Sequence, residues 1–202
     1  EQGETDILVG TQMVSKGLDF DNVSLVGIFD VDRMIHFPDF RSAERSFQLL
    51  TQVSGRAGRR NRVGKVLIQT SNPAQPILQK VLRNSYDELF LDEIKEREEF
   101  HYPPFTRLIQ LTVKHIEQPI AQQAAQALAE KLAVSLDKSR VIGPEKPLVE
   151  RIRNLFLFDI MLKLERSLNF KALKPYVQEQ VDWLVTDKKF KGVSVVVDVD
   201  CQ

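Results

Sequence analysis

The sequence has almost no cysteine, no excess of charge of either sign and no long apolar run. Its single cysteine, Cys201, allows no internal disulfide and cannot hold a metal ion alone, so we expect a reducing compartment and no metal site. The 28 basic and 28 acidic residues cancel, so only a local patch can favour nucleic acid. No apolar run reaches the roughly 18 residues of a membrane span, and the first residues lack the order of a signal peptide. These absences predict a cytoplasmic protein that does not cross a membrane.

The first part of the chain has the pattern of a wound α/β sheet. Short apolar runs at residues 6–11, 23–30 and 64–70 are typical of parallel strands that are buried on both faces. Ser42 is a candidate N-cap for a helix that Gly55 ends. The order strand, strand, helix, strand therefore predicts part of a parallel sheet with helices packed on it.

The second part of the chain has a different pattern. A helical stretch is predicted from residue 77 to about residue 100, where Pro103 and Pro104 stop it. Beyond them, alternating strands and amphipathic helices follow the order β-α-β-β-α-β of a ferredoxin-like split sandwich. We predict an α/β part at residues 1–82, a helical connector at residues 83–105 and an α+β domain at residues 106–202.

The segment QVSGRAGRR at residues 52–60 places arginines at the predicted end of a helix. Arginine is always charged, and its rigid fork of donors matches phosphate oxygens. Arg56 and Arg59 are three positions apart and converge on one point, which suits a phosphoryl group that gains negative charge in its transition state. Gln52, one helical turn earlier, is placed to hydrogen-bond a water or a phosphate. Taken alone, so short a pattern favours a solvated basic helix end instead.

The segment GTQMVSKGLDF at residues 10–20 directly follows a predicted strand. The Thr11 hydroxyl and the open backbone at Gly17 are suited to phosphate contact, and Asp19 offers an acceptor for a ribose hydroxyl. The alternative is an ordinary strand-to-helix loop in which Asp19 is only a cap.

In this order along the chain, the two segments resemble motifs V and VI of superfamily 2 helicases. With Asp30-Val31-Asp32, with DFRSAER at residues 39–45 and with Tyr102-Pro103-Pro104-Phe105, the sequence is similar to the PriA family of bacterial replication-restart helicases, also called primosomal protein N′. The resemblance covers essentially the whole chain. It implies a C-terminal fragment, in which the later part of a second RecA-like motor lobe precedes a C-terminal domain that helps to bind branched DNA.

The resemblance also implies roles for single positions. The motif VI arginines of the family reach across the lobe interface to the nucleotide's γ-phosphate, and motif V lies near the nucleotide and the bound strand. The residues so assigned are Arg56, Arg59 and Gln52 for catalysis, Gly17, Asp19, Arg56 and Arg59 for nucleotide binding, and Thr11, Gln12, Lys16 and Arg60 for DNA.

By this resemblance the parent protein is an ATP-dependent 3′-to-5′ DNA helicase that restarts stalled forks and loads the primosome. The chain has no Gly-x-x-x-x-Gly-Lys-Ser/Thr loop and no acidic Mg²⁺ motif, so ATP and Mg²⁺ need the intact protein and the isolated chain is expected to be inactive. The family's zinc site is absent as well, since its Cys-rich insertion is missing. The alternatives are a non-catalytic DNA- or protein-docking module and a piece of an RNA helicase.

The expected partners are forked or single-stranded DNA, single-strand-binding protein and primosome proteins. Family members often carry an aromatic-Arg-aromatic triplet on the strand after Gly-Pro. Here the triplet is Phe156-Leu157-Phe158, so the arginine that would contact the acidic tail of single-strand-binding protein is replaced by leucine. Arg151 and Arg153 lie nearby in the sequence and are candidates to replace it.

Overall fold

A computed structural model describes residues 6–11, 23–57 and 64–199. The chain forms two compact units, Glu1–Glu96 and Arg97–Gln202, and each unit has its own hydrophobic core. The boundary between them falls inside the segment 83–105, so the residues predicted as a connector are shared between the two units. No helix in the described part of the chain is long and apolar enough to cross a membrane.

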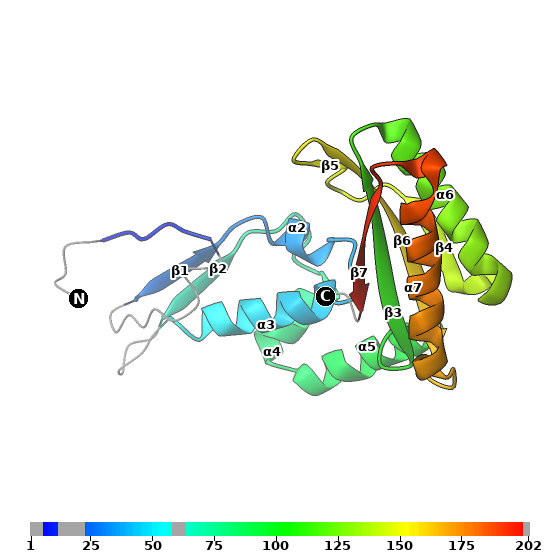
Figure 1. Cartoon of the computed structure of the whole chain (residues 1–202). Coiled ribbons are helices and arrows are strands. Elements are labelled where there is room, and N and C mark those ends of the chain that lie inside the picture. Colours follow the sequence, from blue (N-terminus) through cyan, green and yellow to red (C-terminus); the bar gives the residue numbers. More distant parts are fainter. Residues whose placement is uncertain (1–5, 12–22, 58–63, 200–202) are drawn as a thin grey trace. The chain divides into compact units, whose positions relative to one another are not determined.

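Unit 1 is built on two parallel strands, β1 (Leu25–Ile28) and β2 (Lys65–Ile68), which lie side by side in Figure 1. The chain crosses from one to the other through α2 (Val31–Ile35) and α3 (Ser42–Ser54), as the predicted α/β pattern requires. Both helices bury apolar residues in the core of the unit. This core consists of Val31, Ile35, Phe47, Leu50, Ile77, Leu78 and Leu89.

The predicted strand at residues 6–11 is wrong. These residues form no strand, β1 and β2 pair only with each other among the described residues, and Ile7 and Val9 are 80% and 86% exposed. An apolar run forms a strand only where a neighbouring strand satisfies its backbone hydrogen bonds and other elements cover its side chains. The described part of the chain offers this segment neither.

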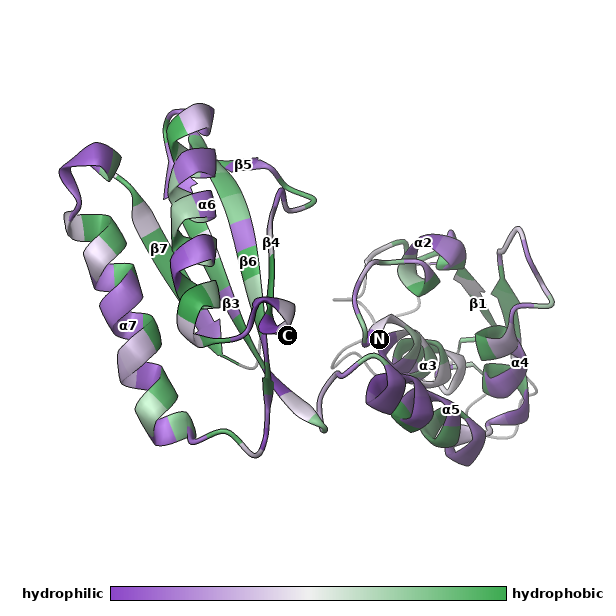
Figure 2. Cartoon of the chain, turned by 90° about the vertical axis from the view of Figure 1, so that its right-hand side faces the viewer, coloured by the Kyte–Doolittle hydropathy of each residue, from purple (hydrophilic) through white to green (hydrophobic). Residues whose placement is uncertain are grey.

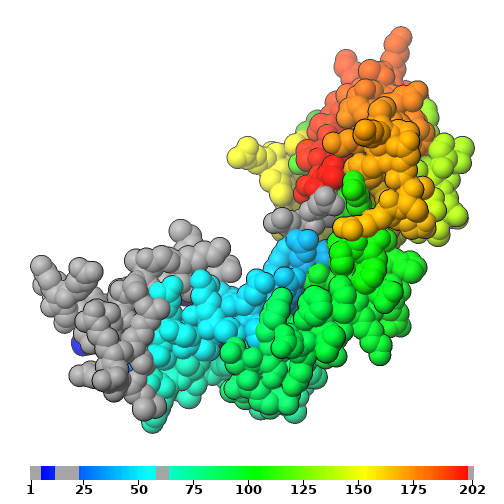
Figure 3. Space-filling model, turned by 90° about the horizontal axis from the view of Figure 1, so that it is seen from below, coloured from blue at the N-terminus to red at the C-terminus, as the bar shows by residue number. Residues whose placement is uncertain are grey.

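The helical stretch predicted over residues 77–100 consists of two helices, α4 (Pro76–Arg83) and α5 (Tyr86–Glu99). Asn84 ends α4 in a left-handed conformation (φ 52°), which asparagine tolerates better than most residues. An ion pair between Lys80 and Asp92 then joins the two helices. In Figure 3 they form one continuous surface that runs from teal to green.

Unit 2 confirms the predicted ferredoxin-like split sandwich. Its strands lie in the order β4-β6-β3-β7, all neighbours are antiparallel, and α6 and α7 cover one face of the sheet (Figure 1). A short strand, β5, adds a hairpin on β6 that the sequence pattern did not predict. The elements are β3 (Thr106–His115), α6 (Gln118–Ser135), η1 (Lys138–Arg140), β4 (Val141–Glu145), β5 (Arg151–Ile152), β6 (Leu155–Glu165), α7 (Phe170–Thr186), η2 (Lys188–Phe190) and β7 (Ser194–Val199).

The two faces of this sheet differ in polarity. Ile109, Leu111 and Val113 of β3 belong to the core under the helices, and their partners on β6 are apolar too. The residues between them lie on the other face, where the Asp159 carboxylate accepts hydrogen bonds from Gln110 (2.7 Å) and Thr112 (2.6 Å). Because side chains alternate between the two faces along a strand, apolar residues at every second position of the sequence predict such a strand.

Candidate nucleotide and nucleic-acid site

The helix that carries the candidate arginine, α3, is fixed at its start by Asp39. One carboxylate oxygen of Asp39 accepts the Arg41 backbone N–H at 2.8 Å, and the other accepts the Arg45 guanidinium at 2.7 Å. Ser42 was the predicted N-cap, but it is the first residue of the helix, its neighbour Arg41 is the cap residue, and no side-chain cap bond forms there. Ser42 is not the cap because Asp39 already closes this turn.

The end of α3 presents Gln52 and Arg56 one helical turn apart. Gly55 caps the helix, and the N–H groups of Gly55, Arg56 and Ala57 donate to the carbonyls of the last turn at 3.0–3.2 Å. Gln52 is exposed and Arg56 is half-buried. Arg56 follows Gly55 in the hydrogen-bonded turn that ends α3, where a positive charge interacts favourably with the helix dipole. Two of the three predicted catalytic residues, Gln52 and Arg56, therefore lie at the same end of α3.

The remaining predicted site residues are described less fully. Thr11 is exposed and lies in the irregular segment 6–11. The others lie outside the described residues, so their assignment continues to rest on the sequence. They are Gln12, Lys16, Gly17, Asp19, Arg59 and Arg60.

Asp32 ties the carboxyl ends of β1 and β2 together, a role that the sequence did not reveal. It lies in the first turn of α2 and accepts three hydrogen bonds, from the Thr70 hydroxyl (2.6 Å) and from the Ser71 backbone N–H and hydroxyl (2.7 Å each). The Thr70 bond first, and then the two Ser71 bonds, hold the pKa of Asp32 below its ordinary value of 3.8. Asp32 therefore links the ends of the two parallel strands of unit 1.

Asp32→Asn is expected to destabilise unit 1 at neutral pH. Because the folded pKa of Asp32 lies below its unfolded value, the carboxylate contributes stability above pH 3.8, and this contribution is lost as pH falls through the folded pKa. Urea unfolding of parent and variant should thus differ at pH 7 and converge in acid. Asp30→Asn is the matched control, since Asp30 is exposed and its left-handed φ of 52° suits asparagine. Equal stability of the parent and Asp32→Asn at pH 7 would contradict the assignment.

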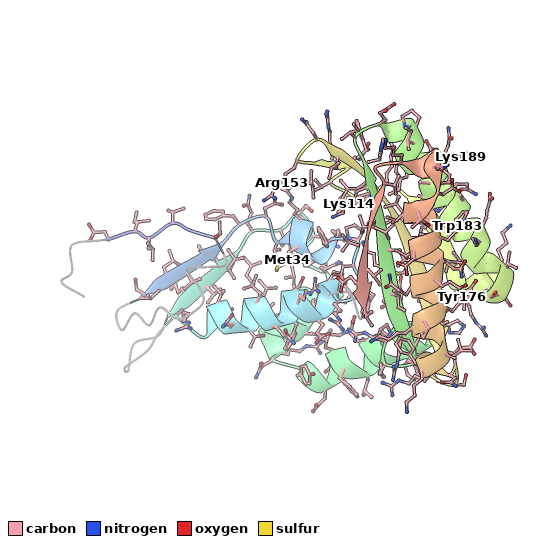
Figure 4. The ribbon with its side chains drawn as sticks, viewed as in Figure 1. Met34, Lys114, Arg153, Tyr176, Trp183 and Lys189 are labelled. Carbon is pink, nitrogen blue, oxygen red and sulfur yellow. The ribbon has the colours of Figure 1, made fainter. Side chains whose placement is uncertain are left out.

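In unit 2, the triplet Phe156-Leu157-Phe158 lies on β6. Leu157 is 6% exposed and lies on the face away from the helices, whereas Phe158 is in the core. The Arg151 guanidinium stacks on the Phe156 ring at 4.8 Å, so one of the two nearby arginines does lie beside the triplet. Arg153 is exposed in the hairpin turn, where Figure 4 labels it.

Comparison with known proteins assigns each unit to a family. Residues 1–61 match the helicase conserved C-terminal domain, and residues 98–202 match the primosomal protein N C-terminal domain. Among curated relatives, the replication restart protein PriA of Bacillus subtilis is 40% identical over 88% of the chain, that of Treponema pallidum 36% over 98%, and that of Thermotoga maritima 32% over 98%. The chain spans 22%, 29% and 25% of the length of these relatives.

The parallel sheet, the arginine at the end of α3 and the match to the helicase domain define unit 1 as part of a RecA-like helicase lobe. Joined to it is a ferredoxin-like domain. The chain belongs to the PriA family of replication restart proteins.

Proposed function

We propose that this chain supplies the arginine side of the ATP site, and the C-terminal domain, of an ATP-dependent 3′-to-5′ DNA helicase. In this proposal the helicase restarts stalled replication forks and loads the primosome. Its substrate is ATP, and it moves along forked or single-stranded DNA. Its partners are single-strand-binding protein and primosome proteins.

One observation carries the proposal: Arg56 stands on an ordered turn at the end of α3, one turn beyond Gln52. The backbone hydrogen bonds of this turn fix where the Arg56 side chain starts, and a charge that is positioned in advance is what stabilises a transition state. In phosphoryl transfer, an arginine that reaches the transferring group is worth about 10³–10⁵ in rate. In this proposal Gln52 orients the water or an oxygen of the phosphate.

The other half of the ATP site must come from outside the chain. The sequence contains no phosphate-cradling loop and no acidic Mg²⁺ motif. Mg²⁺, when bound there, would neutralise phosphate charge. The part of this chain is to bring Arg56, together with Arg59, to the γ-phosphate when the two lobes close, and to withdraw it when they open.

The purified chain of 202 residues is expected to hydrolyse no ATP, with or without DNA, because it holds only one side of the site. Phosphate release should equal the buffer rate, while the full-length protein shows DNA-stimulated turnover. Binding of forked DNA by the same chain, weakened by salt, would favour the docking role of unit 2 that was the alternative. ATP hydrolysis by the pure chain would contradict the proposal that the chain supplies only one side of the ATP site.

A further inference from the structure

The two edges of the sheet in unit 2 are built differently. At the β4 edge, Gly143 has a φ of 100° and is followed by Pro144, and the pairing with β6 shifts between Ile142 and Glu145. Proline lacks a backbone donor, and an irregularity of this kind bends a strand, so both features oppose pairing with a further strand. The β4 edge is therefore protected.

The β7 edge has no such protection. Among the described residues, β7 pairs only with β3, and its backbone makes no hydrogen bond outside the sheet. It has the sequence SVVVDV, with no proline and no lysine, and Val196, Val197 and Val199 are 47%, 39% and 38% exposed. In Figure 2, which colours residues by hydropathy, β7 is mainly green. A regular, exposed, valine-rich edge is a template for another strand.

An apolar groove of about 300 Å³ runs along this edge, between β7 and α7. Ile109 of β3 is 1% exposed and belongs to its lining. Lys174, on the exposed side of α7, is the one charged side chain that lines the groove among the described residues. Its other lining residues are Pro175, Val177 and Gln178 of α7 and Val197 and Val199 of β7.

We propose that the β7 edge and this groove dock an extended segment of a partner protein. The segment adds to the sheet as a strand beside β7, inserts an apolar side chain into the groove and places a carboxylate against Lys174. Main-chain hydrogen bonds supply affinity in this mode of recognition, while the groove and the lysine supply specificity. The inference goes beyond the ATP-driven activity proposed above and does not depend on it, since every residue involved lies in unit 2.

A second copy of the chain fits the groove less well than a partner does. The residues of β7 on the helix-covered face are Val195, Val197 and Val199, as their pairing with core residues of β3 shows. The acidic residue of the strand, Asp198, pairs with Gln110 and so lies on the opposite face. A second β7 would therefore bring valines to the groove but no carboxylate to Lys174.

The test uses a random library of short peptides displayed on phage and selected on the 202-residue chain. We expect enriched peptides with alternating apolar residues and an Asp or Glu. In fluorescence polarisation, their affinity should fall about tenfold or more for Val197→Lys, which buries an unpaired charge, and for Lys174→Glu, which repels the carboxylate. Ile142→Lys is the matched control on the other edge, because Ile142 is 38% exposed and Val197 is 39% exposed.

Three outcomes would overturn the proposal. One is the enrichment of no peptide, and another is equal affinity for the parent and for both groove variants. The third is a concentration-dependent dimer that Val197→Lys dissociates, which would make a second copy the occupant. Lys174→Glu keeps the test decisive if Val197→Lys fails to fold, because Lys174 is exposed. Failure of any kind here leaves the ATPase predictions untouched.

Discussion

In the full-length protein, Arg56→Ala is expected to lower DNA-stimulated ATP hydrolysis about 10³-fold or more. Arg56 stands at the end of α3, and the turn that holds it is made by backbone bonds. Truncating the side chain therefore removes the guanidinium and leaves the turn intact. The affinity for single-stranded DNA should change little, because the residues assigned to DNA are others. Steady-state phosphate release and DNA binding by anisotropy measure the two effects separately. Arg59→Ala carries the same expectation by sequence.

Arg33→Ala is the matched control for Arg56→Ala. Arg33 is an exposed arginine in α2 of the same unit and has no assigned role at the nucleotide. Its loss changes the net charge by the same amount and should leave ATP hydrolysis near the parent rate. If Arg33→Ala and Arg56→Ala slow hydrolysis equally, charge rather than position is responsible, and the assignment of Arg56 fails.

Leu128→Ala is expected to lower the free energy of unfolding of unit 2 by about 2–5 kcal/mol. Leu128 is fully buried in α6, within the core between the helices and the sheet. Alanine is the best helix former, so the loss measures the cavity and the removed contacts rather than a weaker helix. Urea unfolding followed by the fluorescence of the single tryptophan reports on this unit, because Trp183 packs against the same core (Figure 4).

Val134→Ala on the same helix is the control for Leu128→Ala. Val134 is 85% exposed, and truncation there should change the free energy of unfolding by no more than about 0.5 kcal/mol. Equal effects of the two substitutions would mean that α6 does not pack on the sheet as described.

The ferredoxin-like half was predictable because its strands alternate and its helices are amphipathic. β3 has core residues at every second position, and this pattern is local, so it can be read from the sequence. The β5 hairpin could not be predicted from the sequence. Its turn depends on two residues with positive φ, Arg153 and Asn154, and the segment is too short to show a period. The segment 6–11 was mistaken for a strand because an apolar run does not say whether a partner strand lies beside it.

The candidate site also has features that could be predicted from the sequence and features that could not. The placement of Gln52 and Arg56 at one helix end could be predicted, since the spacing of the two residues is a local property. The role of Asp32 could not, because its partners Thr70 and Ser71 are 38 and 39 residues away and only the sheet brings them together. At the start of α3 the contacts are local, but Asp39 rather than Ser42 makes them, with the Arg41 backbone N–H and the Arg45 guanidinium.

The central claim is that Arg56 acts on the transferring phosphoryl group, and binding of a transition-state analogue tests it most directly. ADP with aluminium fluoride imitates the phosphoryl group in flight, whereas ADP alone does not. An interaction made only in the transition state affects the analogue and spares the ground state. For Arg56→Ala in the full-length protein we predict a large loss of affinity for ADP–aluminium fluoride with nearly unchanged affinity for ADP. Equal affinity of parent and variant for the analogue would contradict the account.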